Sequence, residues 1–240
     1  MRFIVVDTAD SRGSVALFQN AEIQAVEEHL GDEDYSSWLL TAIKKLLSKL
    51  SLSLAELDGY AVCTGPGSFT GLRVGLTTVK AWAEIYGMPI IAVSRLEALI
   101  AGQQGVNEPF VAAYFDARRD QVFAAIYRKT GEAYELCGEE SVTSLPVFLE
   151  RVRVDAAGEP VRWISPDAQL LESQPIWQSL AARGHVLQAA SPPFAAGFGR
   201  LAYRKFQQGE TRDAVSLDAN YVRRSDAEVL WKGNKSPIKA

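Results

Sequence analysis

The feature of this 240-residue chain that most constrains its fold is a pattern of predicted strands and helices that occurs twice. Each copy begins with a short apolar run that ends in an acid, Asp7 in the first copy and Asp116 in the second, and two further strand-like runs follow. The predicted strands are 3–7, 14–18 and 23–29 in the first copy, and 110–116, 121–127 and 133–136 in the second. Few residues are identical between the copies, so two unrelated β-meanders are the alternative interpretation.

Each copy then continues with helices and a further strand. In the first copy we expect a helix from about Tyr35 to Leu50, with Asp34 available as its N-cap, and a helix from about Phe69 to Tyr86 that is stopped by Gly87. The other expected elements are strands at 59–63, 90–93 and 161–164, a short helix that Ser94 caps and that ends near 102, and helices near 175–183 and 193–208.

The order β-β-β-α-β-α, present twice, predicts an α/β fold of two related lobes, each a mixed sheet with flanking helices. We place the junction near residues 105–108, which gives an N-terminal lobe of residues 1–106 and a C-terminal lobe of residues 107–240. Apolar residues make up 48% of the chain and charged residues 22%, which is typical of a folded chain with a sizeable core.

Composition excludes several classes of function. The only cysteines are Cys63 and Cys137 and the only histidines are His29 and His185, and these four cannot supply the usual zinc spacings or a disulfide framework. Acidic residues number 29 and basic residues 25, so the net charge is −4. Because phosphate binding normally needs a basic face, the chain is not expected to hold nucleic acid unaided.

The sequence also gives an expectation for the cellular compartment. Asp7 falls within what would be the apolar core of a signal peptide, and no uncharged apolar run approaches the roughly 20 residues that a membrane helix needs. Together with the low cysteine content, this predicts a cytoplasmic protein without a membrane partner.

A glycine-rich loop joins the strand at 59–63 to the helix that begins at Phe69. It lacks the Gly-Lys-Ser/Thr of a P-loop and has Thr70 where a dinucleotide fingerprint needs its third glycine. Two interpretations stay open, a tight turn in which Ser68 or Thr70 caps the helix, and an anion site at the helix N-terminus. The candidate residues of this signature loop are Gly65, Pro66, Gly67, Ser68, Phe69, Thr70, Gly71 and Arg73.

The stretch 62–75, with its core GPGSFTGLRVG, resembles the signature of the bacterial tRNA threonylcarbamoyladenosine biosynthesis family TsaB, also called YeaZ. Three further stretches are similar to the same family: the opening IVVDT, the segment DARRDQVF that begins at Asp116, and the segment YVRRSDAE that begins at Tyr221. They occur in the right order and span nearly the whole chain, with little that is diagnostic from about 144 to 190.

The resemblance implies an actin/Hsp70/sugar-kinase-like (ribonuclease H-like) fold of two duplicated lobes, in agreement with the repeat. Catalytic members of that superfamily bind ATP between the lobes through acids and glycine-rich loops. This chain keeps Asp7 but has Arg118 and Arg119 where a phosphate loop needs glycine, and the His-x-x-x-His metal pair of the related catalytic subunit TsaD cannot be written in it. The resemblance therefore implies a non-catalytic copy without a metal or resident cofactor, in which Asp7 is a hydrogen-bonding group at a strand end.

Two helices of the first copy carry more apolar surface than one sheet needs. Apolar residues sweep about 200° around the helix that starts at Tyr35 and about 220° around the helix that starts at Phe69, whereas packing on one face needs roughly 100°. The surplus predicts a second contact, which in the family is TsaD or a second copy in a homodimer; burial under the protein's own second lobe is the alternative. The candidate interface residues are Tyr35, Trp38, Leu39, Ala42, Leu46, Leu76, Val79, Trp82 and Tyr86.

The sequence thus predicts a non-catalytic scaffolding subunit that binds TsaD, in assembly with the ATPase TsaE, and supports threonylcarbamoyl transfer to the adenosine 3′ of the anticodon. On this interpretation most of the tRNA contact lies on TsaD and this chain contacts tRNA indirectly. Leu46→Glu or Val79→Glu is expected to abolish binding of TsaD while leaving the fold intact. Two alternatives stay open: a glycoprotease-like peptidase acting on TsaD with Ser68 as nucleophile, and a nucleotide-binding regulator with ATP or ADP at the partner interface. Residues 231–240 form a basic tail that we expect to be disordered.

Overall fold

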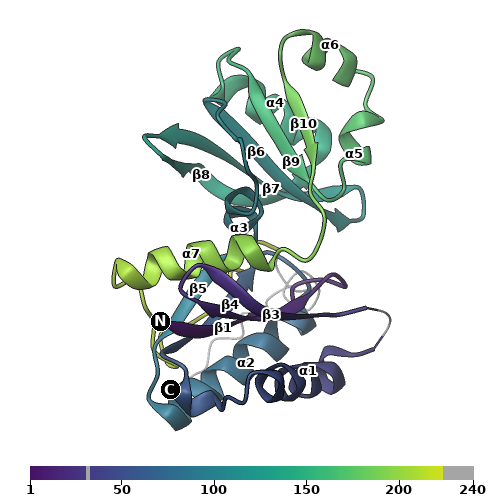
Figure 1. Cartoon of the computed structure of the whole chain (residues 1–240). Helices are drawn as coiled ribbons and strands as arrows, with labels where there is room; N and C mark the ends of the chain where they lie inside the picture. Colours follow the sequence, from purple (N-terminus) through teal and green to yellow (C-terminus); the bar gives the residue numbers. More distant parts are fainter. Residues whose placement is uncertain (31–32, 224–240) are drawn as a thin grey trace, which may run out of the picture.

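The computed structural model describes residues 1–30 and 33–223, which form two α/β lobes (Figure 1). The segment 224–228 of the YVRRSDAE stretch and the basic tail lie outside the described residues. The first lobe is built on the strands β1 (Arg2–Asp7), β2 (Ser14–Gln19), β3 (Glu22–Glu28), β4 (Gly59–Gly65) and β5 (Ile90–Ser94). The second lobe is built on β6 (Phe110–Arg118), β7 (Gln121–Thr130), β8 (Ala133–Ser144), β9 (Val161–Ser165) and β10 (Val186–Ala189).

The two sheets have the same topology. The first has the order β3-β2-β1-β4-β5 and the second the order β8-β7-β6-β9-β10, so that each strand of the first sheet has a counterpart in the second. In both, the first three strands are antiparallel neighbours and the fourth pairs parallel to the first. Two duplicated lobes, each a mixed sheet with flanking helices, are therefore confirmed.

Helices cover both faces of the first sheet. The helices of the chain are α1 (Tyr35–Lys49), α2 (Phe69–Tyr86), α3 (Arg95–Ala101), α4 (Leu145–Asp155), α5 (Gln169–Glu172), α6 (Trp177–Ala182) and α7 (Ala195–Gln207), with a 3₁₀ turn at Leu54–Glu56. In Figure 1, α1 and α2 lie side by side beneath the first sheet, and α7 crosses its opposite face, toward the second lobe.

After the second lobe, the chain returns to the first lobe through helix α7. It contacts every strand of the first sheet and packs along α3, although it follows the whole second sheet in sequence. The expected division at 106–107 separates the two sheets, but α7 and the segment after it pack on the N-terminal lobe. We therefore assign residues 195–219 to the N-terminal lobe as a proposal about domain organisation.

Among the described residues, one apolar cluster extends across both lobes, and a second lies within the second lobe alone. Alternate residues of β6 point to opposite faces of the second sheet, so that Val111, Ala113 and Phe115 join the core of the first lobe, whereas Ala112 and Tyr114 pack under α4. The lobes therefore share buried apolar surface and are not linked by a flexible connection alone.

Helix ends follow the sequence signals in α2 and α3. Ser68 Oγ accepts a hydrogen bond from the Gly71 N–H at 3.3 Å, and α2 ends at Gly87, whose φ of 64° is left-handed. Ser94 likewise caps α3. Asp34 lies at the N-cap position of α1, but its side chain makes no capping hydrogen bond.

The second lobe differs from expectation between residues 136 and 190. Strand β8 continues to Ser144 past Gly138, whose left-handed φ of 75° lies at an irregularity in the pairing with β7, and α4 follows β8 without a loop. Neither α4 nor β10 was expected, and the helix expected at 175–183 is the shorter α6. Polar residues and glycine within the strand hide its alternation from a sequence pattern.

Candidate functional site

The signature loop joins β4 to α2 and lies against the end of β1. The Ser68 N–H donates to the Ala9 carbonyl oxygen at 2.6 Å, and the Leu72 N–H donates to the Ser68 carbonyl oxygen at 2.9 Å. With the Gly71 N–H bonded to the Ser68 side chain, three of the backbone donors near the start of α2 are used within the protein. These contacts favour the tight capped turn over an anion site.

Three glycines of the loop and helix form one stripe that faces Thr8 and Ala9. A Cβ on Gly67 would collide with the Ala9 carbonyl oxygen, one on Gly71 with the Thr8 carbonyl oxygen, and one on Gly75 would lie 2.5 Å from Thr8 Oγ1. Thr8 Oγ1 also donates to the Gly71 carbonyl oxygen at 2.7 Å. The glycines therefore let α2 pack backbone to backbone on the end of β1.

The structure places most of the candidate interface residues inside the first lobe. Leu46 and Val79 have no exposed surface, and the others that belong to the core of this lobe or lie buried beside it are Leu39, Ala42, Leu76 and Trp82. Their side chains pack on the chain's own first sheet, because the centre of each apolar arc faces that sheet. These six side chains therefore pack mainly within the chain's own first lobe, although Leu39 also lines the groove described below, and their expected role as contacts with a partner stays a prediction.

The remaining three candidates lie nearer the surface. Tyr35 and Trp38 form a half-buried aromatic cluster with His29, in which the Tyr35 hydroxyl donates to the Asp10 carbonyl oxygen and accepts from the Gly13 N–H at 2.9 Å. Tyr86, at the end of α2, is 38% exposed. Of the nine, these three are the most exposed.

A shallow groove of about 500 Å³ runs between the outer faces of α1 and α2. Leu40, which is 59% exposed, and Val74 line it, together with Phe69 from the signature loop. At 100° per residue, Leu40 lies at one edge of the apolar arc of α1 and Val74 at one edge of the apolar arc of α2. The edges of wide arcs, rather than their centres, were therefore the signal for an outward-facing apolar surface.

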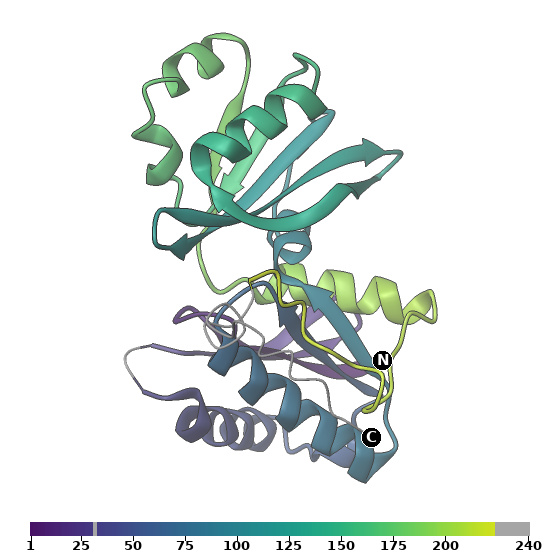
Figure 2. The same ribbon diagram turned by 180° about the vertical axis from the view of Figure 1, so that it is seen from behind.

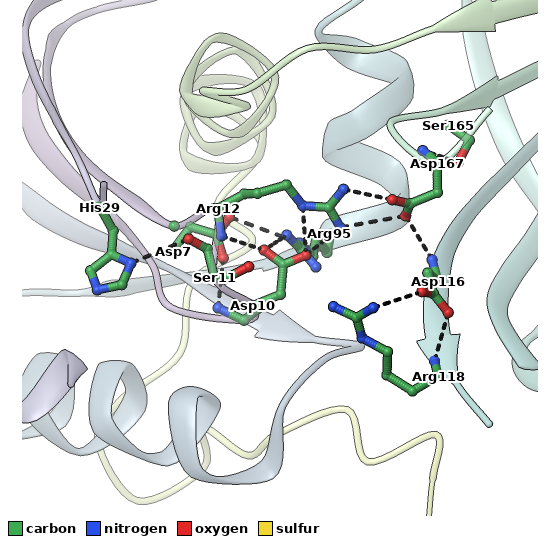
Figure 3. A network of polar contacts seen from close by, with 12 residues as sticks. Asp7, Asp10, Ser11, Arg12, His29, Arg95, Asp116, Arg118, Ser165 and Asp167 are labelled. Atoms are coloured by element: carbon green, nitrogen blue, oxygen red, sulfur yellow. Dashed lines mark hydrogen bonds and ion pairs between the residues drawn. The ribbon is translucent and has the colours of Figure 1, made fainter. Parts of the chain in front are cut away.

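A second hollow, a cleft of about 850 Å³, lies between the lobes. A charged network crosses it (Figure 3): Arg95 Nη2 lies 2.6 Å from Asp10 Oδ1, Arg12 pairs with both Asp10 and Asp167, and Asp167 accepts from the Asp116 N–H at 2.8 Å. Arg12 and Asp167 come from different lobes and are joined at 2.9 Å. The network therefore bridges the lobes across the cleft.

Burial and neighbouring charges have different effects on the pKa values of Asp7 and Asp10, two acids of the first lobe. Burial raises the pKa of Asp7, whose Oδ1 accepts the Ala9 N–H at 3.0 Å, as expected for a group at a strand end. For Asp10 burial acts in the same direction, but the charge of Arg95 and the hydrogen bond from Arg12 outweigh it and hold the pKa well below its usual range. The two arginines therefore favour the charged form of Asp10.

The residues around the cleft do not fit the metal-bound nucleotide that a two-lobed fold of this kind implies. The carboxylates that face the cleft are paired with arginines of the chain itself, and the β6–β7 turn carries Arg118 and Arg119 with left-handed φ angles of 61° and 56°. In the described ranges no three His, Cys, Asp or Glu residues lie close enough to hold a metal ion. The same ranges contain no helix long and apolar enough to cross a membrane.

Glu140 of β8, in the second lobe, forms hydrogen bonds with residues of both lobes. Its Oε2 accepts from Asn220 Nδ2 at 2.5 Å, and its Oε1 accepts from the hydroxyls of Ser94 and Tyr127. Burial raises the pKa of this carboxyl, and the three hydrogen bonds offset only part of that effect. The folded protein therefore holds a proton on Glu140 more tightly than the unfolded chain does.

The raised pKa predicts a specific pH dependence. A raised folded-state pKa gives stability that is complete below the unfolded value, near 4.5, and is lost as the pH rises through the folded value. Urea unfolding at a series of pH values measures this effect. As the pH rises above 4.5, the free energy of unfolding of Glu140→Gln should increase relative to that of the wild type, and the difference should then level off. Parallel free energies of unfolding at all pH values would contradict the assignment.

The comparisons of the sequence and of the structure with known proteins agree with one another. The sequence profile of TsaD, described as tRNA N6-adenosine threonylcarbamoyltransferase, matches residues 28–165. The tRNA threonylcarbamoyladenosine biosynthesis protein TsaB of Haemophilus influenzae is 31% identical over 97% of this chain and 96% of its own length, and that of Bacillus subtilis is 29% identical over 96% and 98%. The structure of YeaZ from Pseudomonas aeruginosa has a TM-score of 0.71 at 28% identity and covers 92% of this chain and 99% of that chain.

Two lobes that repeat one sheet topology, with a cleft between them, are the arrangement of actin- and sugar-kinase-like proteins, and this chain is of that class. The comparisons over nearly the full length narrow the class to one family. The chain belongs to the TsaB (YeaZ) family.

Proposed function

We propose that this chain is a non-catalytic subunit of the cytoplasmic assembly that makes threonylcarbamoyladenosine in tRNA, and that it binds TsaD through the outer faces of α1 and α2. The curated relatives are described as biosynthesis proteins for this modification, which supports membership of the assembly. TsaD is the catalytic partner in this proposal, TsaE is a further member, and tRNA is contacted mainly through TsaD.

The observation that carries the proposal is the contrast between the cleft and the groove. In the cleft, where catalytic proteins of this fold bind their nucleotide, arginines of the chain occupy the carboxylates. In the groove, apolar side chains such as Leu40 are exposed to solvent beside the polar Thr77. Exposed apolar side chains in a groove are the usual mark of a protein contact.

The geometry around Ser68 does not support the alternative function, that of a peptidase. The Ser68 hydroxyl, its candidate nucleophile, accepts a hydrogen bond from the Gly71 N–H and caps α2. A nucleophilic serine needs a base within hydrogen-bonding reach of its hydroxyl. The Ser68 side chain is therefore assigned to helix capping.

Charge substitutions in the groove test the docking surface. Leu40→Glu and Thr77→Glu place a carboxylate where the partner would pack, so we expect the affinity for TsaD of the same organism to fall roughly 100-fold, equivalent to about 3 kcal/mol. Isothermal titration calorimetry with purified TsaD measures the effect.

The matched control is Val147→Glu on α4 of the second lobe, since Val147 is 59% exposed, the same as Leu40. All three variants should keep the melting temperature of the wild type within a few degrees, because each side chain is at the surface. Equal affinities for wild type, Leu40→Glu and Thr77→Glu would remove α1 and α2 as the docking surface.

A further inference from the structure

Four residues of the segment that follows α7 contact both lobes. In Figure 2 this segment runs from the end of α7 back along the first lobe to the junction between the lobes. Leu217 is buried in the core of the first lobe and anchors this segment. Residues 220–223, which we name the strap, then line the inter-lobe cleft, and they include the first three residues of the YVRRSDAE stretch.

The strap is attached to the first lobe at two places. The Asn220 N–H donates to the Thr64 carbonyl oxygen of β4 at 2.7 Å. The Asn220 carbonyl oxygen would lie 2.9 Å from a Cβ on Gly65, so the first glycine of the signature loop leaves room for the strap. Further on, the Tyr221 ring packs on the Phe69 ring with centroids 5.0 Å apart.

The same residues hold the second lobe. Asn220 Nδ2 donates to Glu140 of β8 at 2.5 Å. Arg223 donates to the Ala117 carbonyl oxygen at 2.8 Å and to Gln121 Oε1 at 2.7 Å, and its guanidinium lies over the Phe123 ring. Hydrogen bonds from a guanidinium are among the stronger ones in proteins, so Arg223 is the main attachment of the strap to the β6–β7 turn.

The strap also reaches the groove between α1 and α2. The Tyr221 hydroxyl accepts from Arg73 Nε at 3.2 Å, and the Arg73 guanidinium lies 3.7 Å from the centroid of the Phe69 ring. Phe69 lines both the cleft and the groove, and Arg73 lines the groove. Tyr221 therefore fixes two side chains on the face where the partner is proposed to bind.

We propose that residues 220–223 hold the two lobes at one angle and, through Tyr221, position Arg73 and Phe69 for the partner. Asn220, Tyr221 and Arg223 are positioning residues: they act through the lobes and through the groove rather than by chemistry of their own. The part of this proposal that concerns the partner rests on the proposed function, whereas the part that concerns the lobes does not.

The lobe angle is measured on the isolated full-length chain. Spin labels at Thr41→Cys on α1 and Val147→Cys on α4, in a Cys137→Ser background, report the distance between the lobes by pulsed electron paramagnetic resonance. We expect one narrow distance distribution for the wild-type strap. Arg223→Ala and Asn220→Ala should broaden it, Arg223→Lys should broaden it less, and Val215→Ala, at an exposed position before the strap, should leave it unchanged.

Partner affinity is the second measurement. Tyr221→Phe removes only the hydrogen bond to Arg73 and should weaken binding of TsaD about 3-fold, whereas Tyr221→Ala also removes the ring contact and should weaken it about 10-fold or more. Circular dichroism of each variant verifies that the fold is kept. If Tyr221→Ala does not fold, the test rests on Tyr221→Phe, which retains the ring.

The outcomes are distinguishable. If Arg223→Ala and Asn220→Ala both give the distance distribution of the wild type, the strap does not set the angle between the lobes. This conclusion is independent of the affinity for TsaD. Unchanged affinity in both Tyr221 variants, with Leu40→Glu still impaired, would overturn its role at the groove and leave the docking surface in place. Broadened distances together with normal affinity in Leu40→Glu would support the strap and reject the proposed docking surface.

Discussion

Leu46→Glu is expected to unfold the N-terminal lobe, not to weaken partner binding selectively. Leu46 has no exposed surface and lies in the core between α1 and the first sheet. Truncating such a leucine to alanine costs about 2–5 kcal/mol, and burying an unpaired carboxylate adds to that cost. The whole free energy of unfolding of a domain is only about 5–15 kcal/mol, so this one substitution removes most of it.

Thermal unfolding followed by circular dichroism measures this effect. Leu40→Glu is the matched control, because it introduces the same charge on the same helix at a side chain that is 59% exposed. We expect Leu46→Glu to be insoluble or to melt far below the wild type, and Leu40→Glu to melt close to it. A Leu46→Glu variant that melts within a few degrees of the wild type and fails to bind TsaD would restore Leu46 to the interface. Val79→Glu, at an equally buried position of α2, should behave as Leu46→Glu does.

Gly71→Ala is expected to have the second largest effect. Its Cβ would collide with the carbonyl oxygen of Thr8, a backbone atom that cannot rotate away as a flexible side chain can. The first turn of α2 would have to move off the end of β1, with loss of the bond from Thr8 Oγ1 to the Gly71 carbonyl oxygen. We expect a loss of about 3 kcal/mol in the free energy of unfolding, the upper part of the usual range for overpacking.

The control for this substitution is Gly87→Ala at the other end of α2. A Cβ on Gly87 meets nothing within 4 Å, but its φ of 64° is left-handed, so alanine there should cost only about 1 kcal/mol. Urea unfolding of both variants separates close packing from backbone strain. Equal losses for the two alanines would contradict the close approach of α2 to β1.

Local signals in the sequence were sufficient for much of the first lobe. The bounds of α2 are set by the Ser68 cap and by Gly87, and both residues directly flank the helix in the sequence. The duplication was visible because Asp7 and Asp116 end corresponding strands, or come near their ends, in the two sheets. By contrast, Gly138 and the polar residues of β8 interrupt its alternation, and this is why the second half of that strand was not predicted.

Long-range pairing accounts for what could not be predicted. Arg12 and Asp167 are 155 residues apart, and Arg73 and Tyr221 are 148 apart, so no periodic pattern connects them. Most of the candidate interface residues lie inside the first lobe for a related reason. A helical wheel gives the width of an apolar arc but not which part of it meets the chain's own sheet, and here the centre of each arc does.

The most direct test of the proposed function is a reconstituted reaction. TsaD and TsaE of the same organism are supplied with tRNA, ATP and the threonylcarbamoyl donor, and threonylcarbamoyladenosine is measured without this chain, with the wild type, and with Leu40→Glu. We expect full product with the wild type, little product without it or with Leu40→Glu, and none from the chain alone. Equal product in the absence of the chain, or product made by the chain without TsaD, would contradict a non-catalytic subunit that acts through the α1–α2 groove.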